Sequence, residues 1–167
     1  MILNLFYPAS YLSHKNHFFL EDKRIIDFIE KEQIQIILTI ENQLLKINSK
    51  NFQFIGKISN TKCMNYIRNS SAILFLSSYE SLGLPILEAC MHKKSLIVPK
   101  LSYSEELIGD SGYYLEYPLN CDNFIQVIQD FKYDFIHNSN KIAKLMNNFI
   151  CSEELISIFL NKLNCKI

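Results

Sequence analysis

The chain has 167 residues, of which 49% are hydrophobic and 20% charged, a composition that suits one folded domain and argues against intrinsic disorder. Its 17 basic and 17 acidic residues cancel to a net charge of +0, so we expect no nucleic-acid partner. Five scattered cysteines without a Cys-x-x-Cys pair argue against a zinc site and a disulfide framework, and they are typical of a reducing compartment.

No apolar run approaches the ~18 residues that a membrane helix needs. The first eight residues also lack the basic region and the long apolar stretch of a signal peptide. We therefore expect a cytoplasmic protein, with a peripheral position at the inner face of the membrane as the alternative.

Short apolar runs bounded by proline, glycine or polar residues predict six strands. They lie at residues 2–7, 35–40, 52–55, 72–76, 95–98 and 113–116. Helical spacing of apolar residues predicts the helices between them, at residues 16–32, 60–68, 85–92 and 105–108. Asn16 and Ser59 are the expected N-caps of the first two helices. This alternation predicts a parallel, doubly wound α/β sheet of the Rossmann-like type.

The pattern after Pro118 is helical only. It predicts three helices, at residues 123–131, 135–149 and 153–163. We therefore expect a Rossmann-like domain over residues 1–131, followed by a helical carboxyl-terminal tail over residues 132–167 that packs on it.

The loop at residues 77–85, Ser-Ser-Tyr-Glu-Ser-Leu-Gly-Leu-Pro, is the best candidate site, because ligands of a parallel sheet bind beyond the carboxyl ends of its strands. Gly83 lets main-chain N–H groups approach a ligand, and the helix N-terminus after it favours an anion such as phosphate. Glu80 and Glu88 frame this turn with seven residues between them. The helix dipole alone favours an early glutamate, so the residues by themselves leave a purely structural role open.

Residues 79–89 resemble the Glu–seven residues–Glu motif of retaining family 4 glycosyltransferases, which have the GT-B fold. Residues 54–58 resemble the strand and loop on the nucleotide side of that family's site, and residues 101–112 resemble the segment after the next strand. Residues 7–17 resemble a variant of the first loop, where a lysine meets the donor diphosphate. The resemblance covers about residues 2–131 and implies the carboxyl-terminal, donor-binding half of such an enzyme.

The resemblance also implies a role for each matching residue. The main chain of the turn would hold the donor β-phosphate through Ser81, Leu82, Gly83 and Leu84. Glu88 would bind the ribose hydroxyls, and the two catalytic residues would be Glu80, on the transferred sugar, and Lys15, on the departing diphosphate. A nucleoside diphosphate sugar would be the donor substrate, with no metal and no other cofactor. The implied activity is hexose transfer with retention, in surface polysaccharide or glycolipid synthesis by analogy.

Two departures from the family pattern affect this interpretation. The arginine that usually precedes the lysine has no counterpart, because Ser10 or Tyr11 stands near its position. Lysine cannot make the bidentate contact that arginine makes with phosphate. The acceptor site of GT-B enzymes lies largely in an amino-terminal domain that the resemblance does not cover. We therefore expect a separate chain with that domain, or a homo-oligomer, and an exposed apolar surface where the partner docks.

Two other functions stay open. One is a truncated, catalytically inactive module or remnant that still binds a nucleotide sugar, although decay would be expected to erode Glu80, Gly83 and Glu88, which are all present. The other is a sugar-nucleotide epimerase of GT-B type, which product analysis would distinguish from a transferase.

Four further polar residues lie near the expected site. We expect His14 and His17 to be solvated loop residues rather than phosphate ligands. Glu105 and Glu106 suit either a contact near the donor or the acidic start of a short helix, and the sequence favours neither.

Overall fold

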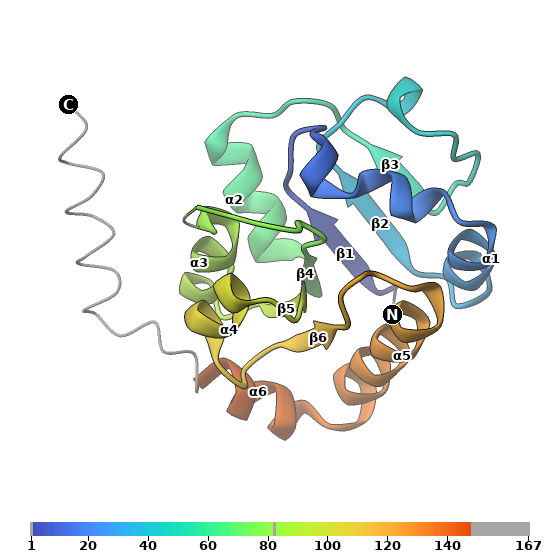
Figure 1. The fold of residues 1–167 in the computed structure, drawn as a ribbon. Coiled ribbons are helices and arrows are strands. Elements are labelled where there is room, and N and C mark those ends of the chain that lie inside the picture. The colour runs from blue at the N-terminus through green and yellow to red at the C-terminus, as the bar shows by residue number, and fades with distance from the viewer. Residues whose placement is uncertain (1, 82, 148–167) are drawn as a thin grey trace, which may run out of the picture.

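The computed structural model of the chain describes residues 2–81 and 83–147, and it contains one parallel sheet. The six strands lie in the order β3-β2-β1-β4-β5-β6 (Figure 1). Their bounds are β1 Asn4–Tyr7, β2 Gln35–Leu38, β3 Phe52–Phe54, β4 Ala72–Leu74, β5 Ser95–Pro99 and β6 Tyr113–Leu115. This order confirms the predicted doubly wound, Rossmann-like sheet.

Helices cover both faces of the sheet. Figure 1 shows α1 and α5 on one face and α2 and α3 on the other. The α-helices are α1 Lys23–Lys31, α2 Asn60–Asn69, α3 Leu84–Met91, α4 Ser102–Ile108, α5 Cys121–His137 and α6 Ser139–Asn147. The loops of the described residues also contain the short 3₁₀ helices η1 Ser13–Lys15, η2 His17–Glu21 and η3 Asn42–Leu44.

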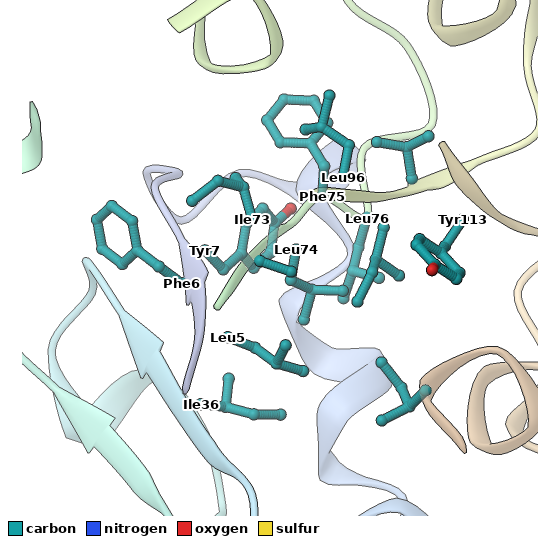
Figure 2. Close-up of a cluster of buried hydrophobic side chains, with 14 of the residues drawn as sticks. Leu5, Phe6, Tyr7, Ile36, Ile73, Leu74, Phe75, Leu76, Leu96 and Tyr113 are labelled. Carbon is teal, nitrogen blue, oxygen red and sulfur yellow. The ribbon is translucent and has the colours of Figure 1, made fainter. Parts of the chain in front are cut away.

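The core lies around the central strands, β1 and β4. Every residue of β4 and β5 is buried, as expected for parallel strands that are covered on both faces. Figure 2 shows Leu5, Phe6 and Tyr7 of β1 in one buried cluster with Phe75 and Leu76, which follow β4. The strand order reverses between β1 and β4, so the carboxyl ends of these two strands form the topological switch point where ligands of such sheets bind.

The first predicted helix is wrong at its start. Residues 17–21 form the 3₁₀ helix η2, and α1 begins only at Lys23, where the Asp22 carboxylate accepts a hydrogen bond from the Arg24 N–H at 2.8 Å. Asn16 does not cap an α-helix. It has a left-handed backbone with φ 51°, and its side-chain amide donates to the Leu76 carbonyl at 2.8 Å instead. A long-range contact therefore replaces the local capping that the sequence indicates.

The predicted break between residues 131 and 135 is also wrong, because α5 is continuous from Cys121 to His137. Asp134 does not interrupt the helix, since its carboxylate accepts hydrogen bonds from Tyr113 Oη at 2.8 Å and Lys141 Nζ at 2.5 Å. The predicted domain boundary after residue 131 falls inside this helix. The helix predicted at residues 153–163 lies outside the described residues. In the described part of the chain, no helix is both long and apolar enough to cross a membrane.

Candidate active site

The loops that follow β1 and β4 lie side by side at the switch point of the sheet. The Ser78 N–H donates to the His14 carbonyl at 2.8 Å, and Asn16 Nδ2 donates to the Leu76 carbonyl at 2.8 Å. The His14 and Tyr79 rings stack with their centroids 4.4 Å apart. Two segments that are 60 residues apart in sequence therefore form one continuous surface.

The two predicted catalytic residues meet on this surface. Lys15 comes from η1 after β1, Glu80 comes from the loop after β4, and Lys15 Nζ forms a hydrogen-bonded ion pair with Glu80 Oε1. Each side chain is only 13% exposed, and Lys15 Nζ lies 5.3 Å from the centroid of the Phe75 ring. The Lys15 ammonium group has three N–H donors, so it can exchange its hydrogen bond with the carboxylate for one with an incoming phosphate oxygen.

The turn between Glu80 and α3 depends on Gly83. This residue is the N-cap of α3 with φ 56° and ψ 40°, a left-handed conformation that favours glycine. A Cβ atom at this position would lie 2.6 Å from Leu107 Cδ1. The Gly83 carbonyl accepts from the N–H groups of Ile86 at 2.9 Å and Leu87 at 3.1 Å.

Two main-chain donors at this turn are unpaired in the described part of the chain, one on the buried Gly83 and one on the exposed Leu84. Within residues 2–81 and 83–147, the N–H groups of Gly83 and Leu84 have no acceptor. Both N–H groups lie at the positive end of the α3 dipole, an arrangement that favours binding of an anion. Ser81 is exposed, and the predicted contact at Leu82 lies outside the described residues.

Glu88 lies on α3, half-buried, at the far end of the predicted motif. Burial raises the pKa of its carboxyl group above the usual range. Burial raises the pKa of the Cys63 thiol of α2 to about 11, and the negative charge of Glu88 makes a smaller contribution. Cys63 therefore lies near Glu88. Among the described residues, the Glu88 carboxylate has no hydrogen-bond or ion-pair partner, so its oxygens are available to donors from a ligand.

A cavity of about 440 Å³ lies beyond the carboxyl ends of β1, β2 and β3, and its lining includes none of Lys15, Glu80, Gly83 and Glu88. Its lining includes Ser10 and Tyr11 from the first loop, Lys57 after β3, and Cys63, the neighbour of Glu88. Lys57 therefore supplies a positive charge to this cavity, although it comes from a different loop than the arginine that the family pattern would place in the first loop.

The loop after β2, which no motif in the sequence marks as part of the site, also contributes to the cavity. Thr39 and Glu41 line the cavity. The Glu41 carboxylate packs against Gly56, where a Cβ atom would lie 2.5 Å from Glu41 Oε1. Gly56 has φ 63°, so the turn itself needs glycine. The sequence feature that indicates this loop is its position after the predicted second strand, because parallel topology places the carboxyl ends of all strands at the same edge.

The expectation that His17 is a solvated loop residue is wrong. Its side chain is buried with 1% exposure, and its ring stacks on that of Tyr7 at 4.6 Å between centroids. Burial lowers the pKa of His17 to about 4, so the ring is neutral near pH 7 and serves in packing. His14 is half-buried, and Glu105 and Glu106 are exposed on α4.

A family model described as Glycosyl transferases group 1 matches residues 23–148, which is most of the chain. The matched range includes Glu80, Gly83 and Glu88 and begins after Lys15. No curated protein sequence matches the chain.

Solved structures resemble the whole described fold. The carboxyl-terminal domain of LpcC, a glycosyl transferase group 1 family protein from Francisella tularensis, has a TM-score of 0.65 at 22% identity and covers 93% of this chain and 85% of that one. HepE of Anabaena, solved with UDP and glucose, has a TM-score of 0.65 at 15% identity, with 98% and 48% covered. A mutant of S. aureus TarM, solved with UDP among its ligands, has a TM-score of 0.69 at 17% identity, with 96% and 34% covered. The chain therefore spans a third to a half of the longer proteins.

Proposed function

The chain belongs to the group 1 glycosyl transferases, and from that premise we propose that it binds a nucleoside diphosphate sugar and supplies the donor site for hexose transfer with retention. It has the fold of the carboxyl-terminal half of a GT-B enzyme, as its likeness to the LpcC domain shows. The observation that carries the proposal is the ion pair between Lys15 and Glu80, which joins two loops at the switch point of the sheet.

The diphosphate of the donor lies, in this proposal, between Lys15 and the start of α3. The N–H groups of Gly83 and Leu84 and the dipole of α3 provide fixed positive charge on one side. The Lys15 ammonium group provides a mobile cation on the other side. Oriented donors aimed at the charge that develops on a leaving group are among the strongest catalytic devices, so this pair of features suits departure of a nucleoside diphosphate.

The nucleoside occupies the cavity of about 440 Å³ beyond β1, β2 and β3. Glu88 binds the ribose hydroxyls, since its carboxylate lies next to Cys63 at the cavity wall. Glu80 contacts hydroxyls of the transferred sugar once Lys15 has turned to the diphosphate. We expect no metal ion at this site, and a transfer rate that is the same with and without EDTA would support that expectation.

The acceptor requires a second domain, which we propose lies on a separate chain or on a second copy of this one. Exposed apolar side chains surround the candidate site at the carboxyl edge of the sheet. They are Tyr11, Leu12, Tyr79, Leu84 and Tyr117. Apolar side chains gathered around a charged site are typical of a surface that another domain covers. Surface polysaccharide or glycolipid synthesis in the cytoplasm, free or at the inner face of the membrane, is the proposed context.

Calorimetric titration of the purified chain with UDP, GDP and their sugar conjugates tests the proposal. We expect one of these nucleotides to bind with a dissociation constant between about 1 µM and 1 mM, the usual range for enzyme substrates. Glu88→Ala should weaken that binding, whereas Glu106→Ala, an exposed change on α4, should not. Binding to none of these nucleotides would contradict the proposal. Binding without transfer in the presence of a partner domain would favour the inactive module.

A further inference from the structure

We propose that Tyr7 and Tyr103 are positioning residues for the transfer, because their hydroxyl groups hold the two main-chain segments that bring Lys15 and Glu80 together. The inference rests on the proposed function for its meaning, since it assigns these tyrosines to the same donor site. Neither residue belongs to the Glu–seven residues–Glu motif or to the turn at Gly83.

Tyr7 holds the segment that carries Lys15. It is the last residue of β1, its side chain has no exposed surface, and its hydroxyl donates a hydrogen bond to the main-chain carbonyl of Lys15. Its ring is fixed from both sides: it stacks on His17 at 4.6 Å and meets the edge of Phe75 at 6.0 Å between centroids. Figure 2 shows Tyr7 and Phe75 within the same buried cluster. The carbonyl of Lys15 is therefore anchored to the rigid centre of the sheet.

Tyr103 holds the segment that carries Glu80. It lies on α4 after β5, and its hydroxyl donates to the main-chain carbonyl of Ser77 at 2.6 Å. Ser77 is fully buried and precedes Glu80 by three residues. The loop after β4 is thus tied to a helix that follows a different strand, in addition to its contacts with the first loop.

Both hydroxyls remain donors throughout the physiological range. Burial raises the pKa of Tyr7 and of Tyr103 above the usual value near 10, and the negative charge of Glu80 adds to the effect in both. Each tyrosine therefore contributes a neutral, permanently protonated hydroxyl whose acceptor is a main-chain carbonyl. Their function is positional, and they are not expected to exchange a proton with substrate.

The geometry explains why two anchors are needed. The hydrogen bonds of Ser78 with His14 and of Asn16 with Leu76 join the two loops to each other. Neither of these two hydrogen bonds involves β1 or α4. Tyr7 ties the joined loops to β1 and Tyr103 ties them to α4, so the ion pair has a fixed place relative to the start of α3. Displacements near 1 Å are costly in catalysis, which makes such anchors effective.

The test compares three single hydroxyl deletions. Tyr7→Phe and Tyr103→Phe each remove one anchor and keep the ring. Tyr114→Phe is the matched control, because the Tyr114 hydroxyl also donates to a main-chain carbonyl, that of Gly109, at the end of α4 away from the site. Urea unfolding of all three variants first measures how much stability each deletion removes.

The first readout is the acylation rate of Lys15. Peptide mass spectrometry measures this rate, with the exposed Lys57 as internal reference. It needs no nucleotide, so it tests positioning even if the proposed function fails. We expect Lys15 to react about 3- to 10-fold faster in Tyr7→Phe and Tyr103→Phe than in the wild type, because the partly buried ion pair loosens. Tyr114→Phe should leave the rate unchanged. Equal rates in all four proteins would overturn the inference.

The second readout is affinity for UDP, or for GDP if the titration shows that nucleotide to bind. We expect Tyr7→Phe to weaken diphosphate binding about 3- to 10-fold and to leave binding of the nucleoside alone unchanged. In a Lys15→Met background, Tyr7→Phe should have no further effect, since it acts through Lys15. A loss in that background as large as in the wild type would overturn the inference. Absence of nucleotide binding by the wild type would contradict the proposed function and leave the acylation result standing.

Discussion

Two regions of the molecule contain the same three chemical groups, a lysine, a carboxylate and a tyrosine, and use them differently. At the carboxyl edge of the sheet, Lys15 pairs with Glu80 beside the anchor Tyr7. On the far side of β6, Lys141 of α6 pairs with Asp134 of α5 at 2.5 Å. The comparison sets the ion pair that we propose to be functional against one that links three elements of the fold.

The difference lies in how fully each carboxylate is satisfied. The Asp134 side chain is 6% exposed, and its Oδ2 accepts from both Lys141 and Tyr113, whose ring also lies 5.9 Å from the Lys141 ammonium group. Burial alone would raise the pKa of Asp134, but the hydrogen bonds from Lys141 and Tyr113 outweigh it and lower the pKa. That cluster is complete, and it fastens α6 to α5 and β6.

The pair at the switch point is incomplete by contrast. In the described part of the chain, Lys15 is the sole hydrogen-bond partner of the Glu80 carboxylate. The main-chain donors of Gly83 and Leu84 stand nearby without acceptors. Unsatisfied groups can be satisfied by a ligand, whereas Asp134 Oδ2 already has two donors from within the fold.

The largest expected effect comes from breaking one pair at a time. Lys15→Met should weaken UDP binding at least about 10-fold, because the diphosphate loses its mobile cation, and should cost about 1–3 kcal/mol of stability, because the Glu80 carboxylate, only 13% exposed, loses its partner. Calorimetric affinity and urea unfolding of the same preparation measure both quantities.

Asp134→Ala should leave UDP affinity unchanged and serves as the counterpart of that experiment. It leaves the Tyr113 hydroxyl and the Lys141 ammonium group without their acceptor, so we expect a loss of about 1–3 kcal/mol in the free energy of unfolding. UDP affinity at a temperature where the variant is folded should equal that of the wild type. A loss of affinity comparable to that of Lys15→Met would remove the distinction between the two regions.

Glycine substitutions sharpen the comparison next. Gly83→Ala and Gly112→Ala each place a Cβ atom 2.6 Å from the end of an isoleucine or leucine side chain, but only Gly83 has a positive φ. We expect Gly83→Ala to cost about 1–2 kcal/mol more stability and to weaken UDP binding several-fold, since the phosphate turn is distorted. Equal effects on affinity from both variants would show that the turn at Gly83 has no special role.

The pH dependence of binding tests Glu88. Its folded-state pKa is raised by burial, so its ionised form is lost already as the pH falls from neutral through that raised value. If ionised Glu88 accepts the ribose hydroxyls, UDP affinity should fall over this range in the wild type. Glu88→Gln should bind UDP more weakly at neutral pH and should not show the fall in affinity that comes from protonation of Glu88. Protonation of UDP itself affects both proteins equally. Parallel pH profiles would contradict the assignment.

The smallest expected effect has the opposite sign to the others. Glu80→Gln removes the carboxylate that competes with phosphate for Lys15, so UDP should bind about 2- to 5-fold more tightly, while transfer of the sugar is lost. Side-by-side titrations of the wild type and the variant with UDP measure this gain. Weaker binding of UDP to Glu80→Gln would mean that the carboxylate orients Lys15 toward the diphosphate and does not compete for it.

Local patterns in the sequence are sufficient for the strands, the cap at Ser59 and the spacing of Glu80 and Glu88, because each depends on neighbouring residues. Ser59 Oγ accepts from the Lys62 N–H, as the cap prediction requires. The family match agrees with the fold that alternation of strands and helices predicts. The roles of the motif residues rest on a resemblance, and they remain predictions.

The remaining features depend on contacts between distant segments, which no local pattern contains. Strand order alone decides that Lys15 meets Glu80 across 65 residues of sequence, and that the loop after β2 adds Thr39 and Glu41 to the cavity. The sequence does not reveal the burial of His17, because His17 packs on Tyr7, whose position is set by the sheet. The sequence determined which groups this chain has and which turn presents them; tertiary packing decided which groups are satisfied within the fold and which are left for a ligand.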